Sequence, residues 1–467
     1  MKGRVAKSAG LFPGQGAFDG RALLAAAERY PAIGAVFTEI DTVTAPEGGR
    51  KLSEIVLGSE PATMAGLLAD DPWVSQVAIY GVDVAVFRAL SELGWRPDTL
   101  AGHSLGEIAA LACADAYTVA DGARVIWQRV RAVESLDLRG GYMAALSADP
   151  ARARLLIDLI ADESMAVAAE NHPGQTVVSG SEAAMDLLRK VAGSLNVSFA
   201  RLDSAVPFHS PLLRAAVAPF AAAVRRIPVR APSLPVYSAI SGRYYGPDED
   251  LGSMLAAHLV ERVRFADAVR VLHADGVRTF VECGALGVLS KLVRRNLAEA
   301  DPVVVPGVGD ADQSIDSAVA RLRVLGLLGA VAITPDGLLP DADPERLTAF
   351  WAERGGAILD RIRQEFAQYC PAEPAPEADT TTDLGDELRE LYADALEYPV
   401  EVFTDDVLLE AELGIDSVKQ VELLARVSER YGLPARPGDF RLDEVATMGK
   451  VIGYVRSMLD KHATVGH

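Results

Sequence analysis

The most constraining feature of the sequence is residues 371–383 (PAEPAPEADTTTD), which contain no large apolar side chain. Such a segment has nothing to bury that would offset the entropy lost on ordering, so we expect an extended linker. Before it, short apolar runs alternate with helical periodicity, and after it only helical periodicity remains. The chain should therefore fold as an α/β region tethered to a separate all-α domain, residues 384–460.

The region before the linker is typical of a sheet with crossover helices, because short apolar runs are separated by helical patterns. Residues 137–202 have their own rhythm of strand, helix, two strands, helix and strand, the βαββαβ order of a ferredoxin-like unit. We expect this small subdomain to be inserted into a large one within residues 1–305. Residues 306–370 are predicted to be a helical region that packs on the large subdomain.

Charge and cysteine content exclude several classes of protein. The chain has 45 basic against 65 acidic side chains, a formal charge of −20, which disfavours nucleic acid as a partner. Its three cysteines are widely separated and fit neither a disulfide framework nor a metal-ligand spacing, so a reducing cytoplasm is expected. The longest apolar stretch, residues 324–333, is about half of what a membrane span needs, so no membrane association is predicted.

The candidate nucleophile is Ser104, within residues 102–106 (GHSLG). A short extended run precedes it and a strongly helix-forming segment follows, which is the context of a nucleophile elbow. There the hydroxyl projects at a helix N-terminus, where the dipole and free N–H groups favour developing negative charge. By itself the pattern also fits an ordinary capping serine between two glycines.

His209 is the candidate general base, because a serine hydroxyl is a weak nucleophile until an imidazole takes its proton. Prolines bracket it in residues 206–211 (VPFHSP), so its loop is expected to be rigid. A lone histidine is more often structural, and the pairing of His209 with Ser104 is a hypothesis at this point.

A second loop, in residues 11–16 (LFPGQG), follows the first predicted strand and exposes the backbone N–H of Gln15. Together with the N–H of Leu105 it is predicted to form an oxyanion hole. A plain tight turn is the alternative for this loop.

Four segments together resemble the malonyl-CoA:carrier-protein acyltransferases of fatty acid and polyketide synthases: 12–16 (FPGQG), 102–107 (GHSLGE), 171–180 (NHPGQTVVSG) and 207–210 (PFHS). They stand in the family's order at compatible spacings across roughly residues 8–300. The resemblance implies an α/β-hydrolase-like large subdomain with a ferredoxin-like insert. It also implies a Ser–His dyad whose histidine is oriented by backbone carbonyls, and chemistry that requires no metal.

The family also uses an arginine that holds the substrate carboxylate, and Arg129 falls at the matching place after Ser104. A guanidinium can hold a carboxylate bidentately, whereas an acetyl group offers it nothing, so Arg129 should select malonyl-type groups. His103 and Phe208 resemble the pattern of relatives that use unbranched malonyl, since a phenylalanine there crowds an α-methyl group. Without the resemblance, Arg129 would be read as a surface charge of a helix.

Two positions depart from the family pattern. Residues 282–285 (ECGA) lack the proline that usually follows the glycine, and Arg264 stands where stand-alone bacterial relatives carry glutamine. Modular synthases often show an arginine there, so the resemblance to modular synthases is the closer one.

Residues 413–418 (LGIDSV) resemble the phosphopantetheine attachment motif of acyl carrier proteins. The serine in it, Ser417, opens a predicted helix, 417–430, with an apolar face. The resemblance implies a four-helix bundle in which Ser417 carries 4′-phosphopantetheine as a covalent cofactor. Val418 replaces the usual leucine. A capping serine is again the alternative.

The carrier region is strongly acidic, with 17 acidic and 8 basic side chains in residues 384–460. Acidic residues around Ser417 are expected to attract basic patches on a phosphopantetheinyl transferase and on synthase enzymes such as a ketosynthase. They are Glu410, Glu412, Asp416 and Glu422.

The sequence therefore predicts an enzyme that moves a malonyl-type group from coenzyme A through a serine ester to a carrier phosphopantetheine thiol. It would supply units for polyketide or fatty acid synthesis. Two alternatives stay open: an editing hydrolase of acyl thioesters with the same fold, and a catalytically silent carrier platform.

Overall fold

The structure is a computed structural model, which contains an α/β region and a helical carrier region. The described residues are 7–136, 138, 140–202, 204, 206–309, 314–328, 343, 346–347, 350–351, 354–355, 358, 361, 384–396, 400–404, 407, 409, 413, 415, 417–431, 445 and 447–465. The predicted linker lies outside them, as do Cys370, Glu410, Glu412 and Asp416.

The large subdomain is built on a six-stranded sheet in the order β10-β9-β1-β2-β7-β8. Its strands pair in parallel except for β8 at one edge. Parallel strands need crossover connections, which is why helices separate them in the sequence. The strands are β1 (Lys7–Phe12), β2 (Thr99–Gly102), β7 (Val236–Ser238), β8 (Arg243–Tyr244), β9 (Val277–Glu282) and β10 (Val303–Val305).

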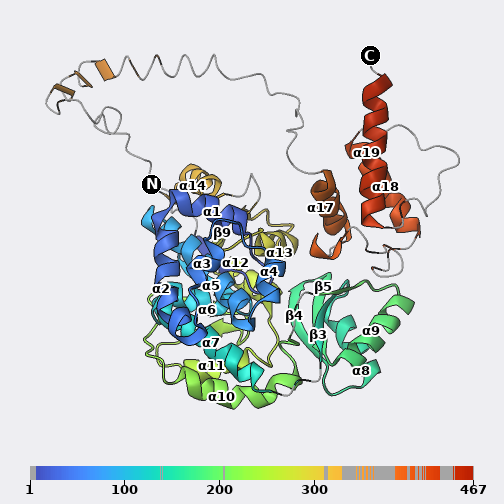
Figure 1. The fold of residues 1–467 in the computed structure, drawn as a ribbon, viewed down its shortest axis with the longest axis horizontal. Helices are drawn as coiled ribbons and strands as arrows, with labels where there is room; N and C mark the ends of the chain where they lie inside the picture. The colour runs from blue at the N-terminus through green and yellow to red at the C-terminus, as the bar shows by residue number, and fades with distance from the viewer. Residues whose placement is uncertain are drawn as a thin grey trace. The chain divides into compact units, whose positions relative to one another are not determined.

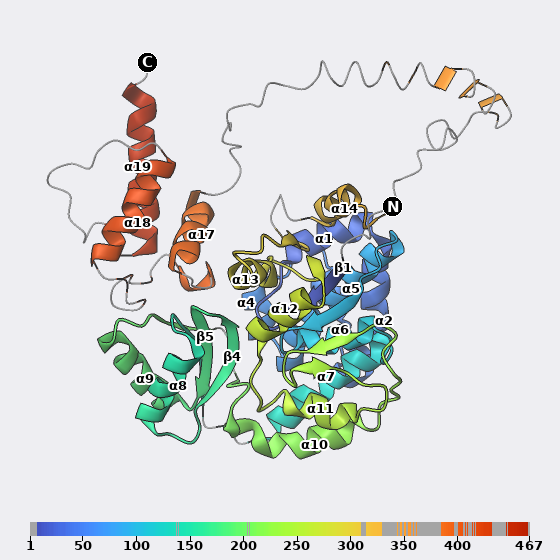
Figure 2. The ribbon, with the colours of Figure 1, turned by 180° about the vertical axis from the view of Figure 1, so that it is seen from behind.

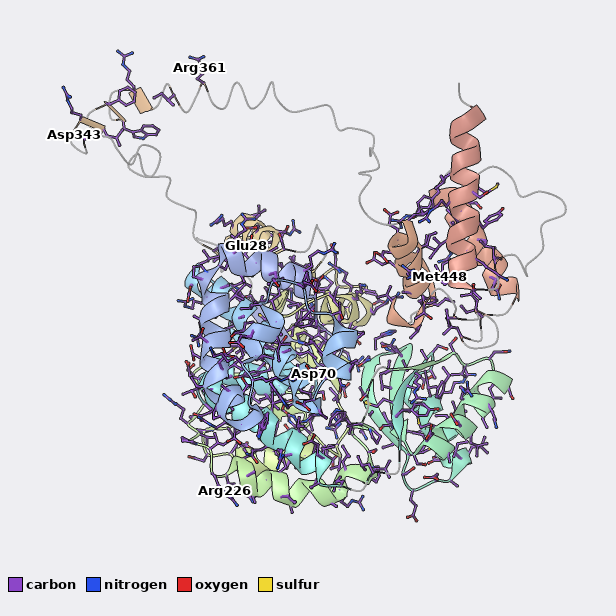
Figure 3. All side chains as sticks on the ribbon, in the orientation of Figure 1. Glu28, Asp70, Arg226, Asp343, Arg361 and Met448 are labelled. Carbon is purple, nitrogen blue, oxygen red and sulfur yellow. The ribbon has the colours of Figure 1, made fainter. Side chains whose placement is uncertain are left out.

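Helices surround this sheet (Figure 1) and bury one continuous apolar core. They are α1 (Gly20–Arg29), α2 (Pro31–Gly48), α3 (Leu52–Val56), α4 (Met64–Ala69), α5 (Pro72–Glu92), α6 (Gly106–Cys113), α7 (Val119–Glu134), η1 (Pro211–Leu213), α10 (Arg214–Val224), α11 (Leu251–Ala257), α12 (Phe265–Ala274), α13 (Val288–Asn296) and α14 (Ile315–Val324). Charged side chains such as Glu28 and Arg226 are exposed at its margin (Figure 3).

Helix α5 is long and apolar enough to cross a bilayer, although a count of consecutive apolar residues singles out residues 324–333 instead. Of its most apolar window, 83% is buried inside the protein, as in the core helix of a globular domain. Buried polar residues, Gln76 and Asp83 among them, interrupt its apolar run, which hides the helix from a simple count of consecutive apolar residues.

The small subdomain is a four-stranded antiparallel sheet in the order β4-β5-β3-β6, with α8 and α9 on one face (Figure 2). This is the strand order of a ferredoxin-like unit, and it confirms the predicted insert. Its own apolar cluster lies between the sheet and the two helices. The elements are β3 (Tyr142–Leu146), α8 (Pro150–Ile160), β4 (Ala166–His172), β5 (Gln175–Gly180), α9 (Glu182–Ser194) and β6 (Phe199–Arg201).

Helix α14 lies beyond the last strand and belongs to the core of the large subdomain. Its buried Ile315, Val319 and Leu322 join that core, and Asp316 accepts a hydrogen bond from the Tyr30 hydroxyl at 2.5 Å. The start of the predicted post-transferase region therefore packs on the large subdomain. The boundaries at residues 305 and 370 stay predictions.

The described part of the carrier region is helical: α17 (Leu384–Leu396), η2 (Val400–Val402), α18 (Ser417–Arg430) and α19 (Met448–Val465). Leu423, Leu424 and Val427 of α18 are buried, so one face of this helix packs inside the domain. Helix α18 begins at Ser417, as the attachment motif predicts.

Candidate active site

Ser104 lies in the tight turn between β2 and α6, so the predicted order of strand, turn and helix is present. Its φ of 55° is in the left-handed region that non-glycine residues rarely adopt. A Cβ atom on Gly106 would stand 2.0 Å from the Phe12 carbonyl oxygen, and one on Gly102 would stand 2.1 Å from the Glu107 nitrogen. Only glycines allow the backbone to bend this closely, and the bend presents the serine hydroxyl.

The structure brings His209 to this hydroxyl. The Nε2 atom of His209 lies 2.7 Å from Ser104 Oγ, although the two residues are 105 positions apart. His209 also has a left-handed φ, 59°, and its backbone N–H donates to the Leu259 carbonyl at 2.9 Å. Both members of the pair are thus held in strained backbone conformations that the surrounding fold imposes, a common feature of active sites.

The protonation state of His209 follows from its second nitrogen. Nδ1 lies 2.7 Å from the Glu261 carbonyl oxygen, which can only accept, so Nδ1 carries the proton. Nε2 is then the lone-pair acceptor for the Ser104 O–H. Burial lowers the pKa of His209 to about 3, and the positive charge of Arg129 adds to this lowering, while the Glu261 carbonyl opposes it. The ring is therefore a neutral base at physiological pH.

Arg129, on α7, is only 2% exposed and has no carboxylate partner among the described residues. Its guanidinium lies over the Phe208 ring, 3.9 Å from the centroid, and Nη1 donates to Gln76 Oε1. Its Nε has no hydrogen-bond partner within the described chain. Desolvation lowers the pKa of Arg129 to about 9, which still leaves it cationic at neutral pH. A buried cation without a counter-ion is costly, and an anionic group bound beside it would offset that cost.

Gln76 is the residue that sequence reasoning missed. It sits in the middle of α5, is 6% exposed and fixes the orientation of the Arg129 guanidinium. The available signal was a polar side chain inside a long apolar helix, which needs a buried partner.

The two predicted oxyanion donors stand at the ends of adjacent strands, because Gln15 follows β1 and Leu105 follows β2. Within the described residues, neither backbone N–H donates a hydrogen bond to the protein. They are thus available to a ligand, and their assignment as an oxyanion hole stays a prediction.

His103 is turned toward the small subdomain. Its Nε2 lies 2.9 Å from Asn171 Oδ1 on β4, and its ring packs at a tilt against Phe265 with centroids 5.4 Å apart. Burial lowers the pKa of His103, an effect that the Asn171 contact opposes. The structure thus gives His103 a role in joining the elbow to β4, while Phe208 contacts Arg129 directly.

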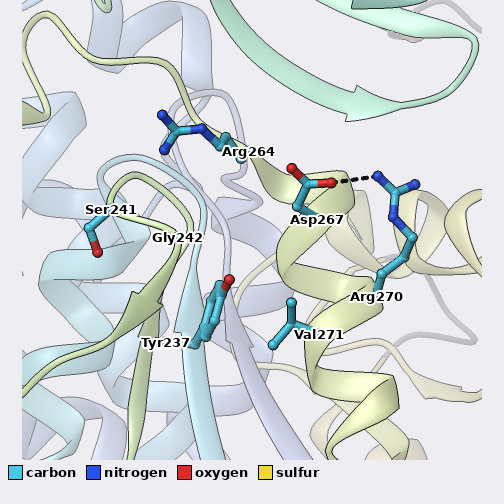
Figure 4. A pocket seen from close by; sticks show the side chains of 7 residues that line it. All are labelled: Tyr237, Ser241, Gly242, Arg264, Asp267, Arg270 and Val271. Atoms are coloured by element: carbon cyan, nitrogen blue, oxygen red, sulfur yellow. Dashed lines mark hydrogen bonds and ion pairs between the residues drawn. The ribbon is translucent and has the colours of Figure 1, made fainter.

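Arg264 lies outside this cluster. It caps α12, donates to the Ile240 carbonyl and lines a surface pocket of about 460 Å³ together with Tyr237, Asp267 and Arg270 (Figure 4). The lining of that pocket includes none of Ser104, His209 or Arg129. The departure from glutamine at this position therefore changes the surface beside α12.

The second departure places Ala285 where the family usually has proline, and this residue is buried and forms an isolated parallel bridge with Val308. The carboxylate of Glu282 accepts from the backbone N–H groups of Leu289 and Ser290 at 3.2 and 2.7 Å, which satisfies free N–H groups at the start of α13.

Cys113 and Cys283 are free thiols, and burial raises the pKa of both. The described residues contain no cluster of three or more His, Cys, Asp or Glu side chains that could hold a metal ion.

The fold and the site define an α/β acyltransferase-like region followed by a helical carrier-like domain. The sequence matches the acyl transferase domain family over residues 11–326 and the phosphopantetheine attachment site family over residues 386–455. The first match covers more than half of the chain, so the protein belongs to the acyl transferase domain family.

Similar proteins are large synthases and solved acyltransferases. A type I polyketide synthase for phenolphthiocerol synthesis from Mycobacterium marinum is 33% identical over 66% of this chain and 14% of its own length. Its Mycobacterium bovis counterpart is 29% identical over 88% of this chain and 18% of its own length. The chain thus spans less than a fifth of either relative.

Two solved structures share the fold at useful identity. The acyltransferase domain of the second salinomycin synthase module has a TM-score of 0.62 at 29% identity, covering 74% of this chain and 80% of that one. The acyl-carrier-protein S-malonyltransferase of Bartonella henselae has a TM-score of 0.60 at 30% identity, covering 68% and 99%.

Proposed function

We propose that this chain transfers a malonyl group from coenzyme A to Ser104, and then to the thiol of 4′-phosphopantetheine carried on Ser417. The observation that carries the proposal is the juxtaposition of a Ser–His pair at 2.7 Å with a buried cation that lacks a counter-ion. The first arrangement provides covalent acyl transfer, and the second provides a place for the free carboxylate of malonate.

In the first half-reaction, His209 Nε2 takes the hydroxyl proton as Ser104 Oγ attacks the thioester carbonyl. The N–H groups of Gln15 and Leu105 are proposed to stabilise the oxyanion, while Arg129 holds the distal carboxylate. When the carbon–sulfur bond breaks, His209 returns its proton to the leaving coenzyme A thiolate. The product is a malonyl ester on Ser104.

The second half-reaction reverses these roles. Bound 4′-phosphopantetheine supplies a thiol that can accept the acyl group. His209 takes the thiol proton and delivers it to Ser104 Oγ as the ester bond breaks, which regenerates the free hydroxyl. Arg129 keeps the malonyl carboxylate in place throughout, so the carbonyl stays near Ser104.

The carrier region fits a covalent arm at Ser417. Helix α18 starts at this residue, and the Nε2 atom of buried Gln420 donates to the Ile415 carbonyl at 2.8 Å, which ties the preceding loop to the helix.

We expect coexpression with a promiscuous phosphopantetheinyl transferase to add one phosphopantetheine mass to the protein. The mass should map to the peptide that contains Ser417, because this serine opens α18 in the attachment motif. Intact-protein and peptide mass spectrometry measure this directly, and Ser417→Ala is the control. An unchanged mass of the wild-type protein, or the same added mass on the variant, would remove the carrier assignment.

The rate of Ser104 acylation is expected to stay nearly constant from pH 8 down to pH 5. Because the folded-state pKa of His209 is lowered to about 3, the ring remains neutral as the pH falls through 6.5. An ordinary histidine with a pKa of about 6.5 would be roughly 30-fold less available as a base at pH 5. Rapid-quench measurement of single-turnover acylation gives the profile. A decline centred near pH 6.5 would contradict this prediction.

The Phe208 ring and the buried setting favour unbranched malonyl as substrate. The ring packs on the guanidinium of Arg129, so it stands beside the place where the malonyl carboxylate would bind. An α-methyl branch would meet it there. We propose His103 as a selectivity residue on the same grounds of position, since it adjoins Ser104 and contacts β4.

Further partners belong to the same proposal: a phosphopantetheinyl transferase and a ketosynthase that draws on the loaded carrier, in the cytoplasm. Incubation with labelled malonyl-CoA separates this function from its alternatives. Label retained on the protein supports transfer, rapid release of free malonate supports an editing hydrolase, and no label supports a silent carrier platform.

A further inference from the structure

Glu170 is a buried carboxylate at the boundary between the two subdomains, and it lies outside the reacting cluster. It is 9% exposed, and its Oε1 atom lies 3.1 Å from Nε of Arg262 in the large subdomain. The same oxygen pairs with Nη2 of Arg154 on α8. One carboxylate thus joins two arginines that come from different subdomains.

The backbone repeats this connection next to Glu170. Val263 forms an isolated parallel bridge with Ala169. The N–H of Val263 donates to the Ala168 carbonyl at 2.9 Å, and the N–H of Glu170 donates to the Val263 carbonyl at 2.8 Å. Strand β4 of the small subdomain is therefore hydrogen-bonded to the large subdomain at Val263, within residues 259–264.

Residues 259–264 are also the segment that holds the imidazole. The Leu259 carbonyl accepts from the backbone N–H of His209 at 2.9 Å, and the Glu261 carbonyl accepts from Nδ1 at 2.7 Å. Arg262 directly follows Glu261. The ion pair with Glu170 thus acts one peptide bond away from the carbonyl that fixes the ring.

The next residue of β4 reaches the other half of the site. Asn171 accepts from His103, the neighbour of Ser104, at 2.9 Å if that ring nitrogen carries the proton. The Asn171 carbonyl also accepts from Asn296 of α13 at 2.7 Å. The end of β4 therefore makes two contacts with the site. Asn171 contacts His103 beside the nucleophile, and Glu170 contacts residues 259–264, which hold His209.

We propose that Glu170 is a positioning residue for acyl transfer. By pairing with Arg262 it holds residues 259–264 against β4, so that the Glu261 carbonyl keeps His209 directed at Ser104. This inference rests on the proposed function for the identity of the reaction, while the alignment of Ser104 and His209 can be measured without it.

The expected effect is on turnover rather than on substrate binding. Without the carboxylate, two arginines face each other at the subdomain boundary, and Arg262 is free to turn toward solvent. Residues 259–264 then keep only their backbone bonds to β4. A displacement of about 1 Å at a catalytic group can slow a reaction by roughly a hundredfold. A partial loosening of this segment should therefore cost on the order of tenfold.

The test compares Glu170→Leu with Glu170→Gln in the full-length protein carrying phosphopantetheine. Glu170→Leu should lower kcat for malonyl transfer about tenfold and leave KM for malonyl-CoA within about twofold. Glu170→Gln should lose activity to a similar degree, because the contact with Arg262 is an ion pair in which Nε makes no hydrogen bond, and the neutral amide lacks the charge. Arg262→Leu should match Glu170→Leu, and the double variant should be no slower than either single one.

A second readout needs no acyl-CoA. A fluorophosphonate probe labels a base-activated serine: Ser104 Oγ attacks phosphorus, fluoride leaves, and His209 takes the proton. Glu170→Leu should slow this labelling by about the same factor as transfer. The matched control is Asp186→Leu on α9, whose carboxylate accepts from the Tyr142 hydroxyl at 2.8 Å inside the small subdomain. It should leave both rates unchanged.

Wild-type labelling of Glu170→Leu would overturn the inference, as would an equal loss in Asp186→Leu, which would indicate general loosening of the small subdomain. If Glu170→Leu does not fold, the Arg262→Leu and Glu170→Gln variants carry the same comparison. Labelling of wild-type Ser104 by the probe but not by malonyl-CoA, with a slow Glu170→Leu, would end the proposed function and keep the positioning role.

Discussion

Replacing His209 by alanine is expected to slow acylation of Ser104 by malonyl-CoA about a thousandfold. A positioned general base typically contributes factors of about 100 to 10,000, and here the base sits 2.7 Å from the hydroxyl in its neutral form. Single-turnover labelling with radioactive malonyl-CoA measures the rate of ester formation.

Two control variants accompany this measurement. Ser104→Ala should give no ester at all, because it lacks the attacking oxygen. His273→Ala, on α12, removes a histidine remote from the dyad and should label like the wild type. Native-rate labelling of His209→Ala would show that another group activates the serine.

Replacing Arg129 by methionine is expected to reduce transfer from malonyl-CoA by about a hundredfold or more and to leave transfer from acetyl-CoA unaffected. Removing one partner of a buried charge pair costs about 2 to 5 kcal/mol, and only malonyl brings a carboxylate to this guanidinium. The ratio of kcat/KM for the two thioesters measures the effect. Arg131→Met, an exposed arginine on the same helix, is the matched control and should keep the native ratio.

The same variant has a stability signature. In the free protein, Arg129 is a buried cation with no counter-ion among the described residues. Methionine removes that desolvation cost, so the melting temperature of Arg129→Met should be equal to or above that of the wild type. Loss of malonyl transfer together with a fall in the melting temperature would instead indicate a structural role for the arginine.

Much of the site could be predicted because several of its residues lie in short sequence motifs. The turn at Ser104 needs glycines on both sides, and those glycines are adjacent in sequence, so the elbow is a local signal. The ferredoxin-like sheet follows equally well from its order of elements. From the residues alone the pairing of Ser104 with His209 is a hypothesis, which the family resemblance supports, since nothing local joins residues so far apart.

What escaped prediction depends on long-range packing. Gln76 reaches Arg129 only because α5 and α7 pack against each other in the core, and neither helix has a sequence motif that predicts this contact. The stacking of Phe208 on Arg129 brings a loop to a helix across the fold. Glu170 and Arg262 likewise meet only when β4 docks on residues 259–264. Such contacts are set by the assembly of subdomains, and the sequence carries no local trace of them.

In the proposed reaction, one hydroxyl, one imidazole and one guanidinium act on the same acyl group. A Ser417→Ala variant, in which no phosphopantetheine arm can remove the ester, is exposed to equal amounts of malonyl-CoA and acetyl-CoA. Peptide mass spectrometry should find malonyl on Ser104 and almost no acetyl. Equal amounts of the two acyl groups on Ser104, or malonyl on a different residue, would show that these three groups do not act together.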